Sequence, residues 1–208
     1  VVLGLTGAVL QPVLRYHWVQ RLSVLAHPAV ALPLWIVTLV FWHIPPVYEF
    51  GVENQIAHAF EHGSFFATSA LLWMPVLEPL PAPEWFGTGA KLVYLGIVWF
   101  AGVIFVNFFW FSGTVLYDRY LDTAPDWGVS ALEDQGNAGT IFMAEHMLLL
   151  LSAMAFYGFR MASESAARQK LLEAGLDRRA VTRAVRHGRA DALAKSAGIT
   201  LKTRAGID

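Results

Sequence analysis

Three long uncharged apolar stretches constrain this chain more than any other feature. Residues 29–40, 63–77 and 92–112 contain no Asp, Glu, Lys or Arg. The hydrocarbon core of a bilayer is about 30 Å thick, so a helix needs about 20 apolar residues to cross it. Charged residues make up only 15% of the chain, whereas a soluble domain carries about 25%. The sequence therefore predicts an all-α, polytopic membrane protein.

We predict a bundle of four full transmembrane helices preceded by the end of an N-terminal span. Proline-rich breaks separate the helices, at Pro45-Pro46 and in residues 78–83, because proline does not continue a helix easily. The predicted domain organisation is a transmembrane bundle in residues 1–161 and a helical tail in residues 162–208. The N-terminal remnant and the four full spans cover residues 1–10, 28–43, 56–77, 88–111 and 134–161.

The charge distribution predicts the orientation of this bundle. Residues 160–208 carry eleven Lys and Arg against five Asp and Glu, whereas residues 1–159 carry four against eleven. Basic segments next to spans stay on the cytoplasmic side. We therefore expect a membrane protein with a cytoplasmic tail and an acidic outer loop at residues 112–133. For the basic tail, acidic lipid headgroups or membrane topology are better explanations than nucleic acid, which is not an expected partner.

Three histidines and a carboxylate lie at the predicted outer ends of two spans. His43 ends the first full span, and His58, Glu61 and His62 occupy the first turns of the next. Ionisable side chains are costly inside a membrane and usually line a site, and residues four apart share one face of a helix. We predict a metal site from these four residues. The start of the last span supplies two polar partners, Asp134 and Gln135.

A deeper group is predicted on the last span. His146 lies about 18 Å further along that helix than Asp134, between Met143 and Met147. Because the chain has no cysteine, disulfides, iron–sulfur clusters and thiolate ligation are excluded. Histidine and methionine without thiols suit copper. Each residue also has an ordinary explanation: hydrogen bonding for the histidines, packing for the methionines and helix capping for Asp134 and Gln135.

Other readings of the same residues stay open. His58-x-x-Glu61-His62 matches the pattern of an inverted zinc protease, although five residues are a weak signal. A membrane haem protein with His62 facing His146 is a second reading. A third is an accessory structural subunit of a membrane complex, whose histidines hold helices together. We do not expect an enzyme.

Four short motifs, in order along the chain, resemble the CtaG-type cytochrome c oxidase assembly factor family over residues 1–161. They are Trp42-His43-Ile44-Pro45-Pro46, His58-x-x-Glu61-His62, Trp73-x-Pro75 and Asp134-Gln135-x-x-Ala138-Gly139. The resemblance implies a plasma-membrane protein that matures haem–copper oxidases. It also implies delivery of copper to the oxidase catalytic subunit, which would be the principal partner besides the lipid bilayer.

The chain departs from that family in two places. Members usually have further spans, including an N-terminal helix that carries Met and His, whereas only the end of such a helix is expected here. Members often have Met-Trp after the Ala-Gly motif, whereas this chain has Met143-Ala144-Glu145-His146-Met147. These departures bear on which metal is bound and on which residues bind it.

Overall fold

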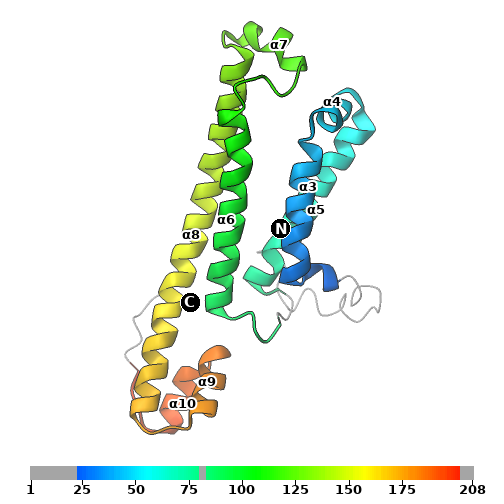
Figure 1. Ribbon diagram of the computed structural model, residues 1–208. Helices are drawn as coiled ribbons and strands as arrows, with labels where there is room; N and C mark the ends of the chain where they lie inside the picture. Colours follow the sequence, from blue (N-terminus) through cyan, green and yellow to red (C-terminus); the bar gives the residue numbers. More distant parts are fainter. Residues whose placement is uncertain (1–22, 80–82, 202–208) are drawn as a thin grey trace.

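The computed structural model describes residues 23–79 and 83–201, and their regular structure is entirely helical, which confirms the predicted all-α class. Two antiparallel helix pairs lie side by side, α3 with α5 and α6 with α8 (Figure 1). The short helices α4 and α7 lie at one end and α9 and α10 at the other. The predicted remnant at residues 1–10 falls outside the described residues. The elements are η3 Ser23–Ala26, α3 Pro28–Trp42, α4 Pro45–Glu53, α5 Gln55–Leu77, α6 Thr88–Phe111, α7 Arg119–Thr123, η4 Ala124–Trp127, α8 Ala131–Glu173, α9 Arg178–Arg186 and α10 Ala190–Ser196.

The predicted count of four full spans is corrected by the structure. Among the described residues, α6 and α8 are long and apolar enough to cross a membrane, and α3 with α4 would add a third as a span bent by 75°. α3 by itself has 15 residues, or about 22 Å, less than the bilayer core. α5 has 23 residues, but His58, Glu61 and His62 in its first turns lower its hydropathy.

α6 and α8 form the most extensive helix pair, and glycines allow their close approach. A Cβ on Gly139 of α8 would lie 3.2 Å from the Cβ of Phe109 and 3.3 Å from Nε1 of Trp110. A Cβ on Gly102 of α6 would overlap the His146 ring. Small residues at such contacts let membrane helices pack backbone to backbone, where dispersion contacts are strongest.

α8 begins three residues before the predicted start, because Ser130 and Glu133 form a capping box. The Ser130 hydroxyl oxygen accepts a hydrogen bond from the Glu133 amide at 3.2 Å, and Glu133 Oε2 accepts one from the Ser130 amide at 2.8 Å. The hydrogen bonds that the Ser130 amide and hydroxyl both donate to the carboxylate lower the pKa of Glu133. The helix then runs unbroken to Glu173, across the predicted boundary between bundle and tail.

The other end of the bundle is tied together by polar contacts to the last turn of α5. Lys91 of α6 is only 2% exposed; its Nζ donates to the Val76 carbonyl at 2.9 Å and pairs with Glu78 at 3.0 Å. The Tyr157 hydroxyl of α8 donates to the same Val76 carbonyl. The Val76 carbonyl of α5 thus accepts hydrogen bonds from both α6 and α8, and these contacts join the two helix pairs.

The tail folds back on the end of α8. Leu171 of α8, Val181 and Val185 of α9 and Ala194 of α10 form a small buried cluster of their own. The arginines of α9 lie on the opposite face of that helix, and Arg178, Arg179, Arg183 and Arg186 are exposed. Up to residue 201 the tail is therefore helical, as predicted, and α9 is amphipathic.

Candidate functional site

The first turns of α5 bring together three of the four residues from which the metal site was predicted. His58 and His62, which we call the rim pair, lie on the exposed side of α5 with ring centroids 4.5 Å apart. Glu61 is 7% exposed, and its Oε2 lies 3.7 Å from Nδ1 of His58. This is the arrangement that spacings of three and four residues produce on one helix. The rim pair is therefore accessible at the molecular surface and has a carboxylate beside it.

Packing between α4, α3 and α5 buries the Glu61 carboxylate. A Cβ at Gly51 would lie 3.0 Å from Glu61 Oε2, so a side chain larger than glycine would crowd the carboxylate. Trp42 Nε1 donates to the Ser64 hydroxyl at 2.7 Å, and that hydroxyl donates to the Glu61 carbonyl at 2.8 Å. These contacts hold Glu61 in place under the rim pair, as an orienting residue near a metal ligand would be held.

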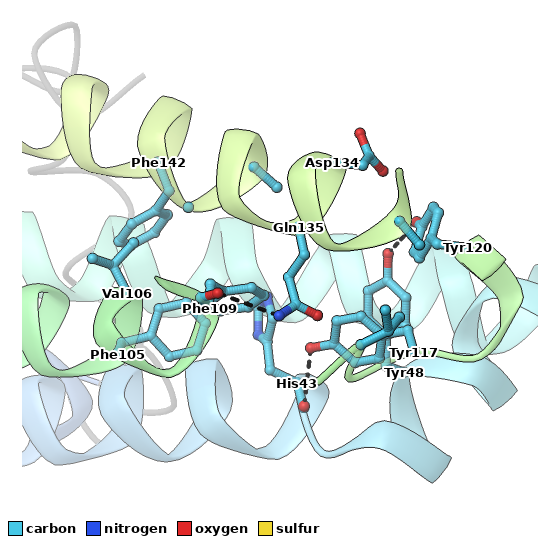
Figure 2. Close-up of a pocket in the computed structure, with 14 residues that line it drawn as sticks. His43, Tyr48, Phe105, Val106, Phe109, Tyr117, Tyr120, Asp134, Gln135 and Phe142 are labelled. Carbon is cyan, nitrogen blue, oxygen red and sulfur yellow. Dashed lines mark hydrogen bonds between the residues drawn. The ribbon is translucent and has the colours of Figure 1, made fainter. Parts of the chain in front are cut away.

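His43 lies in different surroundings. Its Nδ1 is 2.7 Å from the Leu39 carbonyl, which can only accept, so Nδ1 carries the proton and Nε2 is left for another partner. The imidazole packs edge-on against Phe105 with centroids 4.6 Å apart. Figure 2 shows His43 reaching from α3 toward Gln135 of α8, with Phe109 and Tyr117 close by.

A pocket of about 200 Å³ surrounds His43 and brings the predicted polar partners beside it. Asp134 and Gln135 both line this pocket, which we call the aromatic pocket. Both ends of the Gln135 side-chain amide form hydrogen bonds within the protein: its carbonyl accepts from the Leu116 amide at 2.8 Å, and its NH₂ group donates to the Ser112 hydroxyl at 2.8 Å. Gln135 therefore shapes the loop after α6. The remaining lining residues are Tyr48, Phe105, Val106, Phe109, Val115, Tyr117, Tyr120, Ala131, Ala138, Gly139 and Phe142.

Three tyrosines in this pocket were not predicted as site residues. Tyr48 and Tyr120 share a hydrogen bond of 2.6 Å between hydroxyls, and the Tyr48 ring stacks on Tyr117 at 4.0 Å. Burial, with Tyr120 and Glu61 nearby, raises the pKa of Tyr117 to about 12, so its hydroxyl stays protonated and donates to the His43 carbonyl at 3.1 Å. The sequence signal was Tyr48 shortly after Pro45-Pro46, and the pair Tyr117-x-x-Tyr120 in the outer loop.

His146 of α8 has the contacts of a residue that joins helices. Its Nε2 donates to the Val98 carbonyl of α6 at 3.2 Å, and its ring lies parallel to Trp35 and to Phe142, with centroids 6.4 and 5.4 Å away. Met143 is buried, whereas Met147 is 39% exposed. The two methionine side chains are thus in different surroundings. A deeper metal site at His146 stays a prediction.

The single outer cluster expected from the sequence is divided into separate groups. Within residues 23–79 and 83–201, no set of three or more His, Asp and Glu side chains could hold a metal ion. The rim pair with Glu61, His43 with the aromatic pocket, and His146 each have their own partners. The same result gives the zinc-protease pattern no third ligand among these residues.

Comparison with known proteins places the chain in a family. The family model described as cytochrome c oxidase caa3 assembly factor matches residues 1–164, more than three quarters of the chain. No curated protein and no solved structure matches the chain. The resemblance based on the histidine, proline and Asp-Gln motifs is confirmed. With its helical architecture and apolar spans, this chain belongs to the caa3-type cytochrome c oxidase assembly factor family.

Proposed function

We propose that this membrane assembly factor binds copper at the rim pair and delivers it to the catalytic subunit of a haem–copper oxidase. The observation that carries the proposal is the pair itself: two exposed imidazoles with centroids 4.5 Å apart, above the buried carboxylate of Glu61. Neutral imidazole is a good copper ligand, and the chain has no thiol that would compete for the ion.

Copper is cargo in this proposal, so its release matters as much as its binding. Two protein nitrogens at an exposed site leave coordination positions open for ligands of the partner. Copper then moves by ligand exchange: each nitrogen–copper bond breaks as a bond to the partner forms, and no electron is transferred. A site closed by four protein ligands would hold the ion too firmly for a carrier, as structural metal sites do.

We assign the other predicted residues to supporting positions. Glu61 orients His58 and provides negative charge next to the cargo. We propose His43, with Asp134 and Gln135 in the aromatic pocket, as a second copper-binding site. Its Nδ1 forms the hydrogen bond to Leu39, which leaves Nε2 for the ion. We propose His146, with Met143 and Met147, as a third copper-binding site deeper in the membrane. The rim pair faces the outer side of the bacterial plasma membrane, and the tail is cytoplasmic.

A second candidate function has its own observation. His43 and His146 both donate to backbone carbonyls, of Leu39 and Val98, as histidines with a purely structural role do. If the rim pair also carries no metal, the protein acts in oxidase assembly as an accessory subunit, and its histidines stabilise helix packing.

The test is copper binding by the purified full-length chain and its His58→Ala/His62→Ala variant. We expect the wild type to retain copper after loading and washing, and the double variant to lose it because both imidazole ligands are gone. The matched control is His187→Ala, which removes an exposed histidine from the tail. A visible spectrum of the same samples would reveal haem, which would contradict the copper assignment.

A second readout in cells separates cargo from structure. We expect the double variant to lower oxidase activity in membranes, and added copper to restore it by supplying the ion without the carrier. Unchanged copper content in the double variant would reject the rim pair as the site. A loss of oxidase activity that copper does not restore would support the accessory-subunit function.

A further inference from the structure

A second cavity lies at the opposite end of the molecule from the rim pair. It has a volume of about 870 Å³, and it is bounded by Glu78, by residues 83–91, by the part of α8 that follows its apolar stretch, and by the end of α9. We call it the tail pocket. Thr182, Arg186 and His187 of the tail line it together with Thr88 and Arg160 at the ends of the two spans.

Contacts between α6 and α8 show at which level of the membrane the tail pocket lies. The Thr88 hydroxyl donates to Glu164 Oε1 at 2.9 Å, and a Cβ on Gly89 would lie 4.0 Å from the sulfur of Met161. The first turn of α6 is therefore level with residues 161–164 of α8. On the membrane side of this level α6 is uncharged from Leu92 to its end at Phe111, and beyond the level α8 becomes polar, with Glu164, Arg168 and Lys170. The pocket thus lies where lipid headgroups meet the hydrocarbon core.

The charges in the pocket favour an anion. Lys91 pairs with Glu78 at 3.0 Å and Arg160 with Glu164 at 2.9 Å, so these two cations are already compensated. Arg168 of α8 and Arg186 of α9 also line the pocket, and neither forms an ion pair within the described residues. Glu84 is the one acid of the lining outside these pairs, so the lining carries four cations, of Lys91, Arg160, Arg168 and Arg186, against three carboxylates. Guanidinium groups match phosphate oxygens in a bidentate geometry. Two arginines from different helices therefore line one shared space, and their guanidinium groups suit a phosphate group.

The pocket also has an amphipathic side, which distinguishes a lipid from a soluble phosphate. Trp85, 60% exposed, and Met161, 42% exposed, both line it. Tryptophan is enriched at the level of headgroups because its ring is apolar and its N–H is polar. A free phosphate ion would gain nothing from these two side chains, whereas the glycerol and first methylene groups of a phospholipid would contact them.

We propose that the tail pocket binds the headgroup of an anionic phospholipid, with the phosphate held by Arg168 and Arg186 and the glycerol region packed on Trp85. The bound lipid would link the folded tail to the membrane surface at the inner ends of α6 and α8.

The experiment compares lipid retention by the full-length protein in detergent, using native mass spectrometry with phosphatidylglycerol and phosphatidylcholine as probes. We expect wild type to retain phosphatidylglycerol in preference to phosphatidylcholine. Arg168→Gln/Arg186→Gln should weaken that retention by about tenfold or more. The matched control is Arg178→Gln/Arg179→Gln, which removes the same charge from exposed positions of α9 outside the pocket, and we expect less than about a twofold change.

A second variant tests the cavity rather than the charge. Thr182→Trp fills part of the pocket without changing any charged residue, and we expect it to reduce phosphatidylglycerol retention as well. Equal losses in the pocket and control arginine variants would overturn the proposal, since they would indicate diffuse attraction to the basic tail. Displacement of the lipid by millimolar glycerol phosphate would also overturn it, since the site would then recognise a soluble phosphate. Equal retention of both lipids would reject it too.

Discussion

At the scale of single residues, the four histidines predicted as metal ligands fall into two kinds. His58 and His62 are exposed and lie beside each other, whereas His43 and His146 are partly buried and donate to backbone carbonyls. A buried imidazole without a hydrogen bond would lose its solvation with no compensation, which is why both carry one. The first kind has ring nitrogens accessible to a metal ion, and the second contributes to the packing of the spans.

The contact between Gly102 and His146 leads to a stability prediction. In Gly102→Ala, the new Cβ would lie 2.2 Å from Nε2 of His146, so the ring must leave Val98 and its stack on Trp35. We expect a loss of about 1–3 kcal/mol, measured as a lower unfolding midpoint in detergent. Combining it with His146→Ala should cost less than the sum of the two single changes. Additive losses would show that Gly102 and His146 do not interact.

At the scale of elements, the joint between the two helix pairs depends on a few polar contacts at the end of α5. Lys91, Tyr157 and Tyr94 donate to the carbonyls of Val76 and Leu72. The Val76 carbonyl lies at the C-terminal end of its helix, where carbonyls lack partners within the helix. Side chains of α6 and α8 donate the missing hydrogen bonds and at the same time fix the position of α5.

Removing the Lys91 donor should therefore loosen α5. Lys91→Met keeps the length and packing of the side chain but removes the hydrogen bond to Val76 and the ion pair with Glu78. We expect destabilisation of about 1–3 kcal/mol. Amide hydrogen exchange should rise at the end of α5 and stay unchanged at the capped start of α8. Lys195→Met on the exposed tail is the control, and an equal rise in that variant would contradict the prediction.

At the scale of the whole molecule, the two helix pairs present α4 and α7 at one end and the tail at the other (Figure 1). The rim pair, at the start of α5, therefore lies at the end opposite the tail pocket. If α6 and α8 cross the bilayer, the two proposed sites lie on opposite membrane surfaces, one for cargo and the other for a lipid headgroup.

Because the chain contains no cysteine, single cysteines can map its topology without removing native ones. We expect Asn54→Cys and Asp122→Cys to react with an impermeant maleimide added outside cells. Glu84→Cys and Ser196→Cys should react only after the membrane is opened, because the basic tail stays inside. Phe100→Cys, within α6, should react in neither case. Because α5 alone is not apolar enough to be counted among the spans, the pair also tests that helix: reaction of Asn54→Cys and Glu84→Cys from the same side would show that α5 does not cross.

The sequence by itself determined the helical class, the two long spans and the helical tail, because apolar runs and proline breaks act locally along the chain. It also placed His58, Glu61 and His62 together, since neighbours on one helix need no other element to meet. Only the tertiary structure decided the partners of His43 and His146, because the surrounding aromatic rings and the Val98 carbonyl come from other helices. It likewise decided that Lys91 is buried and that Arg168 and Arg186 share one pocket, since folding brings α8 and α9 together.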